Sequence, residues 1–201
     1  MIIGVTGGIG SGKSTVLRAV AQHGYCVYDC DAEAKRIIMA DPEVRRQMIA
    51  LFGEQVYKDG IYQTQYVAAQ VFADKSKLAR LNAIVHPAVI EDIKRKQSAI
   101  STQQSAVLFV ESAVLISSGI DKLCDKVVLI TAPEQERIER VLLRAAKRGQ
   151  HMDTEHVLAR IHAQSIEEES LHHTPYDLKL VNDEATPISD IVEQLIRFVE
   201  Q

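Results

Sequence analysis

The sequence predicts an α/β protein in which helices cover both faces of an open, parallel sheet. Short apolar segments without polar alternation recur along the chain, and such segments are typical of strands in the middle of a parallel sheet. Segments with the periodicity of amphipathic helices separate them. Strands that alternate with helices in this way build an α/β sheet.

The first elements form a βαβ unit. Residues 2–6 are a mostly β-branched run that stops at two glycines, and they predict the first strand. Apolar residues at helical spacing then predict a helix that ends near Gly24, because glycine commonly stops a helix. A second strand is expected over residues 25–28. Strand, helix and strand within about 30 residues form a βαβ unit, and its crossover should be right-handed.

The later elements continue the alternation. Residues 106–110, 126–130 and 178–181 predict three further strands. Helical periodicity fills most of the remaining chain, over residues 32–40, 42–52, 87–98, 133–148, 154–165 and 187–199. Prolines at 42, 87, 133 and 187 stand where a first helical turn could begin, the position at which a helix tolerates proline. We therefore expect helices to start at these prolines.

Two helical stretches interrupt the rhythm. Residues 41–104 show several helices and no convincing strand, apart from a turn at Lys58-Asp59-Gly60. Residues 144–165 are helical, polar and rich in Arg and His. We expect a single domain over residues 1–201, in which both stretches are insertions that project from one edge of the sheet.

The composition excludes several classes of protein. A chain of 201 residues, 46% of them hydrophobic, can bury a sizeable core. Its near-average composition is not that of a collagen, a disordered tail or a disulfide scaffold. The net charge of −4 argues against a general nucleic-acid binder, which normally carries a basic excess.

The same features bear on location. No apolar run approaches the roughly 20 residues that span a bilayer, and the opening lacks the basic residues of a signal peptide. Cys26, Cys30 and Cys124 include no CxxC pair, which favours reduced structural thiols over a metal site. We therefore expect a cytoplasmic protein with no membrane partner.

A glycine loop predicts nucleotide binding. From Gly7 to Ser14 the chain matches the P-loop pattern G-x-x-x-x-G-K-[ST] at every fixed position. Glycines turn backbone N–H groups toward an anionic phosphate, and the following helix points its positive end at the same anion. Lys13 is expected to reach the β- and γ-phosphates, and the Ser14 hydroxyl to bind Mg²⁺. The candidate nucleotide-binding residues are Gly10, Ser11, Gly12, Lys13, Ser14 and Thr15.

The context of the loop supports this interpretation. A chance glycine turn is the alternative, but the motif lies between a predicted strand and a predicted helix, as a P-loop requires. Loop and sheet together indicate a P-loop NTPase-type three-layer core. A GTPase switch would need an Asn-Lys-x-Asp segment and an Asp-x-x-Gly after a strand, and neither is present. A motor or helicase would be longer and more basic, so a small-molecule kinase is favoured.

Two further groups of charged residues suit a kinase. Asp29 and Asp31 follow the second strand, and if the segment is extended they lie on the same side of it. Asp31 is equally well placed as the N-cap of a helix that starts at Ala32. A stripe at helical spacing is formed by Arg137, Arg140, Arg144 and Arg148. Any one of them could belong to an ordinary salt-bridged surface, but for the set we favour closure over phosphates.

On these residues the chain resembles the dephospho-coenzyme A kinases, which are P-loop kinases related to nucleoside monophosphate kinases. The resemblance covers nearly the whole chain. The segments that carry it are Ile3 to Thr15, Asp29 to Asp31, Ile84 to Pro87, Gln135 to Arg144, Arg160 to Gln164, and Asn182-Asp183.

The resemblance implies transfer of the ATP γ-phosphate to the ribose 3′-hydroxyl of dephospho-CoA. Residues 41–104 then correspond to a helical CoA-binding insertion and residues 144–165 to a lid. Asp31 aligns with the proposed catalytic base of the family, and Arg140 with its arginine near the transferred phosphate. His86 falls on a family His-Pro element, although it could equally satisfy a backbone carbonyl. Lys35 and Arg144 complete the expected acceptor-binding residues.

Three positions depart from the family pattern. Lys35 stands where the family often has Arg, which would replace a bidentate contact with a point charge. The usual Pro-Leu-Leu-x-Glu segment lacks its last acid, and Glu111 at the strand end would occupy related space. The lid stretch around residues 145–153 is longer than usual.

Another small-molecule kinase is the alternative function, followed by a nucleotide-binding module without activity. A monomer is the default assembly.

Overall fold

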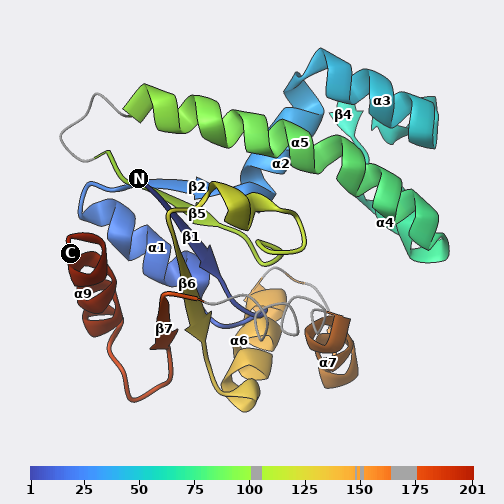
Figure 1. Ribbon diagram of the computed structural model, residues 1–201. Coiled ribbons are helices and arrows are strands. Elements are labelled where there is room, and N and C mark those ends of the chain that lie inside the picture. Colours follow the sequence, from blue (N-terminus) through green and yellow to red (C-terminus); the bar gives the residue numbers. More distant parts are fainter. Residues whose placement is uncertain (101–105, 148, 150–151, 164–175) are drawn as a thin grey trace. The chain divides into compact units, whose positions relative to one another are not determined.

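The computed structural model describes residues 1–100, 106–147, 149, 152–163 and 176–201 (Figure 1). The chain divides into two compact units. The first comprises Met1–Asp29 and Ala99–Gln201, and the second comprises Cys30–Ser98. Each unit is described by itself.

A five-stranded sheet forms the centre of the first unit. The strands are β1 (Ile2–Thr6), β2 (Cys26–Asp29), β5 (Leu108–Glu111), β6 (Lys126–Thr131) and β7 (Leu178–Val181). They lie in the order β2-β5-β1-β6-β7, and every neighbouring pair is parallel. The five strands predicted from the sequence are therefore confirmed, and so is the fold class, a parallel sheet with flanking helices.

Helices of the first unit follow the expected positions. They are α1 (Lys13–Gln22), α6 (Glu134–Lys147), α7 (Thr154–Ala163) and α9 (Ile188–Val199), with a 3-10 turn η2 (Ile120–Leu123). Pro133 and Pro187 directly precede α6 and α9, so the two predicted starts are correct to within one residue. Figure 1 shows α1 and α9 side by side against the sheet.

The apolar periodicity of these helices is explained by one core. Ile3 and Val5 of β1 are fully buried against Val16 and Leu17 of α1, and Leu195 of α9 packs on the same cluster. A smaller apolar cluster joins α6 to α7, and Ile9 of the glycine loop packs against it. The helix that carries the arginine stripe is thereby anchored beside the loop.

The second unit is mainly helical. Its helices are α2 (Cys30–Ala40), α3 (Pro42–Phe52), α4 (Thr64–Ala73) and α5 (Lys75–Ile100). The last two residues of α5 already belong to the first unit, which resumes at Ala99. Pro42 opens α3 as predicted, and the Asp41 carboxylate accepts hydrogen bonds from the backbone N–H groups of Glu43 and Val44. Asp41 is therefore the N-cap of α3, because its carboxylate accepts hydrogen bonds from backbone N–H groups that have no partner within the helix.

The prediction that residues 41–104 hold no strand is wrong. After a 3-10 turn, η1 (Glu54–Val56), β3 (Tyr57–Lys58) and β4 (Ile61–Tyr62) form an antiparallel hairpin. Asp59 and Gly60 both have positive φ, 51° and 78°, which a two-residue hairpin turn of this kind requires. The turn was identified from the sequence, but strands of two residues are too short to show alternation.

The predicted helix start at Pro87 is also wrong, because Pro87 lies inside α5. Proline in a helix interior removes one backbone hydrogen bond and typically costs about 3 kcal/mol. Val85, Val89 and Ile93 continue the same buried stripe across the proline. Burial of such side chains contributes about 1.5–3 kcal/mol each, so this stripe is sufficient to offset the cost and keep the helix continuous.

The two predicted insertions are described only in part. Of 41–104, residues 101–104 lie outside the described residues, as do 148, 150–151 and 164–165 of the predicted lid. Within the part of the chain that the structure describes, no helix is long and apolar enough to cross a membrane.

Candidate phosphate-binding site

The glycine loop lies at the carboxyl edge of the sheet. It joins β1 to α1, and because all five strands are parallel, the residues that end or follow β5, β6 and β7 meet at the same edge. Glu111 ends β5, and Asn182 directly follows β7. The fold thus brings residues that are 97 and 171 positions from their loop partners to one loop.

Gly10 and Gly12 are loop positions with no room for a side chain. Gly12 has φ +90°, and a Cβ there would lie 2.0 Å from Asn182 Nδ2. Gly10 has φ +80°, and its Cβ would lie 2.5 Å from the backbone oxygen of Arg137. Both the left-handed backbone and the close packing therefore require glycine, as expected for a loop that wraps a phosphate.

Lys13 is held against the loop rather than extended into solvent. It is 7% exposed, and its Nζ donates hydrogen bonds to the backbone oxygens of Gly7, at 2.7 Å, and Gly8, at 3.2 Å. The ammonium group therefore lies at the N-terminus of α1, where the positive end of the helix dipole also favours an anion.

Ser11 and Thr15 complete the loop. The Ser11 hydroxyl is buried and has no hydrogen-bond partner among the described residues, which leaves a donor available to a bound anion. Thr15 is exposed, and its hydroxyl accepts a hydrogen bond from Arg18 at 3.3 Å. The six loop residues predicted from the sequence are thus contiguous in the first unit.

Ser14 pairs with an acid at the end of a neighbouring strand. Its Oγ donates a hydrogen bond to Glu111 Oε1 at 2.6 Å. Hydroxyl and carboxylate oxygens are ligands that Mg²⁺ prefers, and Mg²⁺ is usually held by one or two carboxylates together with substrate phosphates. The Ser14 hydroxyl and the Glu111 carboxylate are an oxygen pair beside the loop that fits this mode of binding.

Arg140 lies beside the loop and has two partners. One guanidinium nitrogen contacts Glu136 Oε2 at 2.6 Å, and the other donates to the backbone oxygen of Asn182 at 2.9 Å. The salt bridge expected as the alternative to phosphate binding is therefore present. A Cβ on Gly12 would lie 4.0 Å from Arg140 Nη1, which places the cation near the loop as well. Arg144, one turn later, is exposed.

The remaining predicted residues belong to the second unit. Helix α2 begins at Cys30, so Asp31 is in its first turn. The predicted N-cap role of Asp31 and its extended pairing with Asp29 are therefore both wrong. Asp31 and Lys35 are exposed, whereas His86 on α5 is half-buried, and this burial lowers the pKa of its imidazole.

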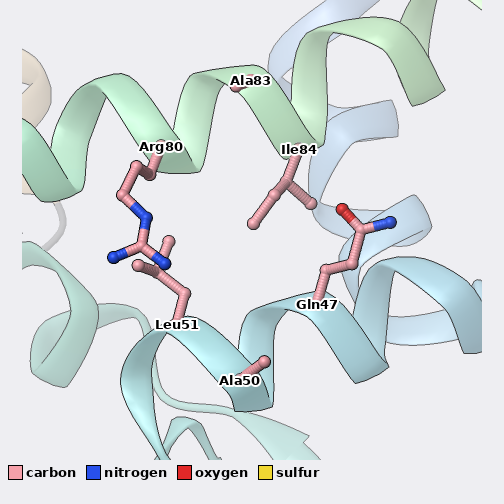
Figure 2. A pocket seen from close by; sticks show the side chains of 6 residues that line it. All are labelled: Gln47, Ala50, Leu51, Arg80, Ala83 and Ile84. Carbon is pink, nitrogen blue, oxygen red and sulfur yellow. The ribbon is translucent and has the colours of Figure 1, made fainter.

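The second unit also has an open pocket between α3 and α5, with a volume of about 360 Å³ (Figure 2). Arg80 and Ile84 of α5 point toward Leu51 and Gln47 of α3. Its lining is Gln47, Ala50, Leu51, Arg80, Ala83 and Ile84. None of the acceptor-binding residues predicted from the sequence lines this pocket.

Asn182 was given no site role from the sequence, and Arg137 was included only as a member of the arginine stripe. Arg137 Nε donates to the backbone oxygen of Ile9 at 3.0 Å, and Asn182 Nδ2 donates to that of Ser11 at 2.8 Å. One signal for Asn182 was available, because it directly follows a predicted strand and strand ends share an edge. The reach of Arg137 depends on the packing of α6, which no local pattern specifies.

Comparison with known proteins decides the family. A family model for dephospho-CoA kinase matches residues 1–187. The chain belongs to the dephospho-CoA kinase family. A dephospho-CoA kinase from Porphyromonas gingivalis is 35% identical over 198 residues, which cover 98% of this chain and 92% of that protein. The kinase from Thermobifida fusca is 37% identical over 83% of this chain and 80% of its own.

Solved structures share the fold of this chain. A crystal structure of a Thermus thermophilus protein has a TM-score of 0.79 and 33% identity, and covers 99% of this chain and 95% of its own. A shikimate kinase from Acinetobacter baumannii has a TM-score of 0.57 and 16% identity, with coverage of 98% and 92%. At that identity the likeness shows the fold alone, which dephospho-CoA kinases share with other small-molecule kinases.

Proposed function

We propose that this chain transfers the γ-phosphate of ATP to the ribose 3′-hydroxyl of dephospho-CoA, giving CoA and ADP. The observation that carries the proposal is the glycine loop with buried Lys13 and the Ser14–Glu111 pair, in a chain of the dephospho-CoA kinase family. A phosphate cradle alone would suit any nucleotide enzyme, whereas family membership selects the acceptor.

The loop supplies the ATP-binding chemistry. Gly10 and Gly12 allow backbone N–H groups to converge on the phosphates. Lys13, next to the positive end of α1, stabilises the charge that spreads over the γ-phosphoryl oxygens during transfer. Arg140 is the second cation in the proposal, and phosphate would compete with Glu136 for its guanidinium group.

Mg²⁺ is part of the proposal. The Ser14 hydroxyl and Glu111 carboxylate would hold it, since they already contact each other at 2.6 Å. When bound, the ion neutralises charge on the β- and γ-phosphates. Glu111 then takes the place of the acid that is missing from the segment after β5.

Asp31 is proposed as the base. As the 3′-oxygen bonds to the γ-phosphorus, the bond from that phosphorus to the β–γ bridging oxygen breaks and ADP leaves. The hydroxyl proton passes to the Asp31 carboxylate. Lys35, His86 and Arg144 are proposed to bind the acceptor, with the helical stretch 41–104 as its binding region and 144–165 as the lid.

Identification of the product tests the reaction. The protein is incubated with ATP, Mg²⁺ and dephospho-CoA, and the product is analysed by ³¹P NMR and mass spectrometry. We expect CoA with a 3′-phosphate and an equal amount of ADP. The matched control is 3′-deoxy-dephospho-CoA, which lacks the acceptor hydroxyl and should leave ADP release at the background rate. Equal ADP release with both compounds would contradict transfer to that hydroxyl.

The setting of the reaction is also proposed. We infer a cytoplasmic enzyme that binds no nucleic acid, with a monomer as the default assembly. The three cysteines support a reducing compartment, since all of them are free thiols. Burial, with help from Asp121 and Asp125, raises the pKa of Cys124 to about 12, so this thiol stays protonated and unreactive at neutral pH.

A further inference from the structure

Asn182 occupies a junction between the sheet, the glycine loop and α6. It is 4% exposed. Its backbone N–H donates to Thr131 O at 2.8 Å, which continues the pairing of β7 with β6 by one residue. Its backbone oxygen accepts a hydrogen bond from Arg140, and its side-chain amide donates to Ser11 O at 2.8 Å.

The side-chain bond determines the direction of one loop peptide. In a planar trans peptide the C=O and N–H groups point in opposite directions. Because Ser11 O is drawn toward Asn182, the N–H of Gly12 must point away from it. Arg137 donates a hydrogen bond to Ile9 O in the same way, so the N–H of Gly10 must point away from Arg137. Two carbonyls on the outside of the loop are thus held by side chains of other elements.

The fit between Asn182 and the loop is tight. A Cβ on Gly12 would come within 2.0 Å of the Asn182 amide nitrogen, so the loop backbone and this side chain are in direct contact. The Ser11–Asn182 bond is buried, and buried hydrogen bonds are costly to leave unmade. The contact therefore restricts the loop more strongly than an exposed hydrogen bond would.

From these contacts we propose that Asn182 is a positioning residue for phosphoryl transfer. Its side chain orients the Ser11–Gly12 peptide so that the Gly12 N–H faces the phosphates, and its backbone oxygen orients Arg140 toward the same anion. One residue thereby sets a loop donor and a cation relative to each other. The inference rests on the proposed use of ATP by this loop.

Asn182→Asp is the test that changes the shape of the side chain least. The two side chains have nearly the same shape, and the backbone bonds to Thr131 and Arg140 can remain. However, a carboxylate oxygen would face Ser11 O, so the hydrogen bond is lost and replaced by repulsion. We expect the Kd for ADP and the KM for ATP to rise about tenfold or more. The KM for dephospho-CoA should stay within about twofold, since no acceptor contact is altered.

Asp183→Ala is the matched control. The Asp183 carboxylate accepts hydrogen bonds from the Thr186 N–H and hydroxyl at 2.9 and 2.7 Å, but it has no bond to the loop. Removal of the Asp183 carboxylate should lower the melting temperature of the protein while leaving the Kd for ADP at the wild-type value. A purely structural role for Asn182 predicts the same pattern for Asn182→Asp.

ADP binding is measured by calorimetry without an acceptor, and turnover is measured separately. A folded Asn182→Asp protein with wild-type ADP affinity would overturn the proposal. If that variant does not fold, Asn182→Ala, which removes the amide without adding charge, takes its place with the same expected result. A wild-type protein that binds ADP but does not phosphorylate dephospho-CoA would refute only the proposed reaction.

Discussion

Gly12 is a loop position at which the effect of an added methyl group can be worked out from the structure. Gly12→Ala places a Cβ 2.0 Å from Asn182 Nδ2, far inside van der Waals contact, at a residue with φ +90°. Asn182 is buried between β7, the loop and α6 and cannot simply swing into solvent. The amide must shift, and its hydrogen bond to Ser11 O must break.

The magnitude has two parts. A residue with a Cβ in the left-handed region costs about 1–2 kcal/mol relative to glycine. Loss of the buried hydrogen bond, with its groups left unpaired, costs about 1–3 kcal/mol. Together they predict a decrease of roughly 2–5 kcal/mol in the free energy of unfolding. ADP affinity should decrease as well, because the displaced peptide belongs to the cradle.

Gly24→Ala separates the two parts. Gly24 has φ +88°, close to that of Gly12, but a Cβ there would meet no atom within 4 Å. Urea unfolding should therefore show a loss of only about 1–2 kcal/mol for Gly24→Ala. The difference between the two variants measures the Asn182 contribution. In an Asn182→Ala background the clash is absent, so the double variant should lose less than the sum of the single losses.

Two results would refute this reasoning. Equal destabilisation by Gly12→Ala and Gly24→Ala would mean that the close approach to Asn182 does not constrain the loop. Strict additivity of Gly12→Ala and Asn182→Ala would show that the two residues are not coupled. Either result would also weaken the positioning role proposed for Asn182.

Three other predictions concern Lys13, Asp31 and His86. Lys13→Ala should lower kcat about 100-fold or more in the ADP-release assay while ADP still binds the loop; an unchanged kcat would exclude Lys13 from charge stabilisation. Asp31→Asn should bind both substrates, as shown by calorimetry, but turn over about 10²- to 10⁴-fold more slowly. Near-normal turnover would reduce Asp31 to a first-turn acid of α2. Because burial lowers the pKa of His86 below its ordinary value of 6.5, the unfolded chain binds a proton there more readily. Urea midpoints should therefore fall as the pH drops from about 7.5 to about 5.5, and less steeply in His86→Gln; identical slopes would contradict this.

The sheet could be predicted because buried parallel strands and their helices have distinct periods. The predicted helix start at Pro87 was wrong because the prediction assumed that a proline stands only in the first turn of a helix. It took no account of the side chains that are buried on both sides of this proline in the folded protein. Val85, Val89 and Ile93 share a buried face on both sides of the proline. Their spacing of four residues was visible in the sequence, but the burial that makes it decisive is a property of the folded unit.

The candidate site was predictable where its residues are contiguous. Gly10 to Thr15 form one loop and one helix start, so a local motif specifies them. Asp31 was expected either in extended backbone or as the N-cap of a helix from Ala32, whereas α2 already begins at Cys30. The contacts of Glu111 and Asn182 with the loop join residues 97 and 171 positions apart. Such contacts follow from strand order, which the sequence alone did not provide.

A comparison of acceptors tests the central claim most directly. ADP release by the wild-type protein is measured with ATP and Mg²⁺ in the presence of dephospho-CoA, AMP, shikimate or gluconate. The account predicts that dephospho-CoA alone accelerates ADP release well above the rate without acceptor. Turnover with one of the other acceptors, and none with dephospho-CoA, would contradict it.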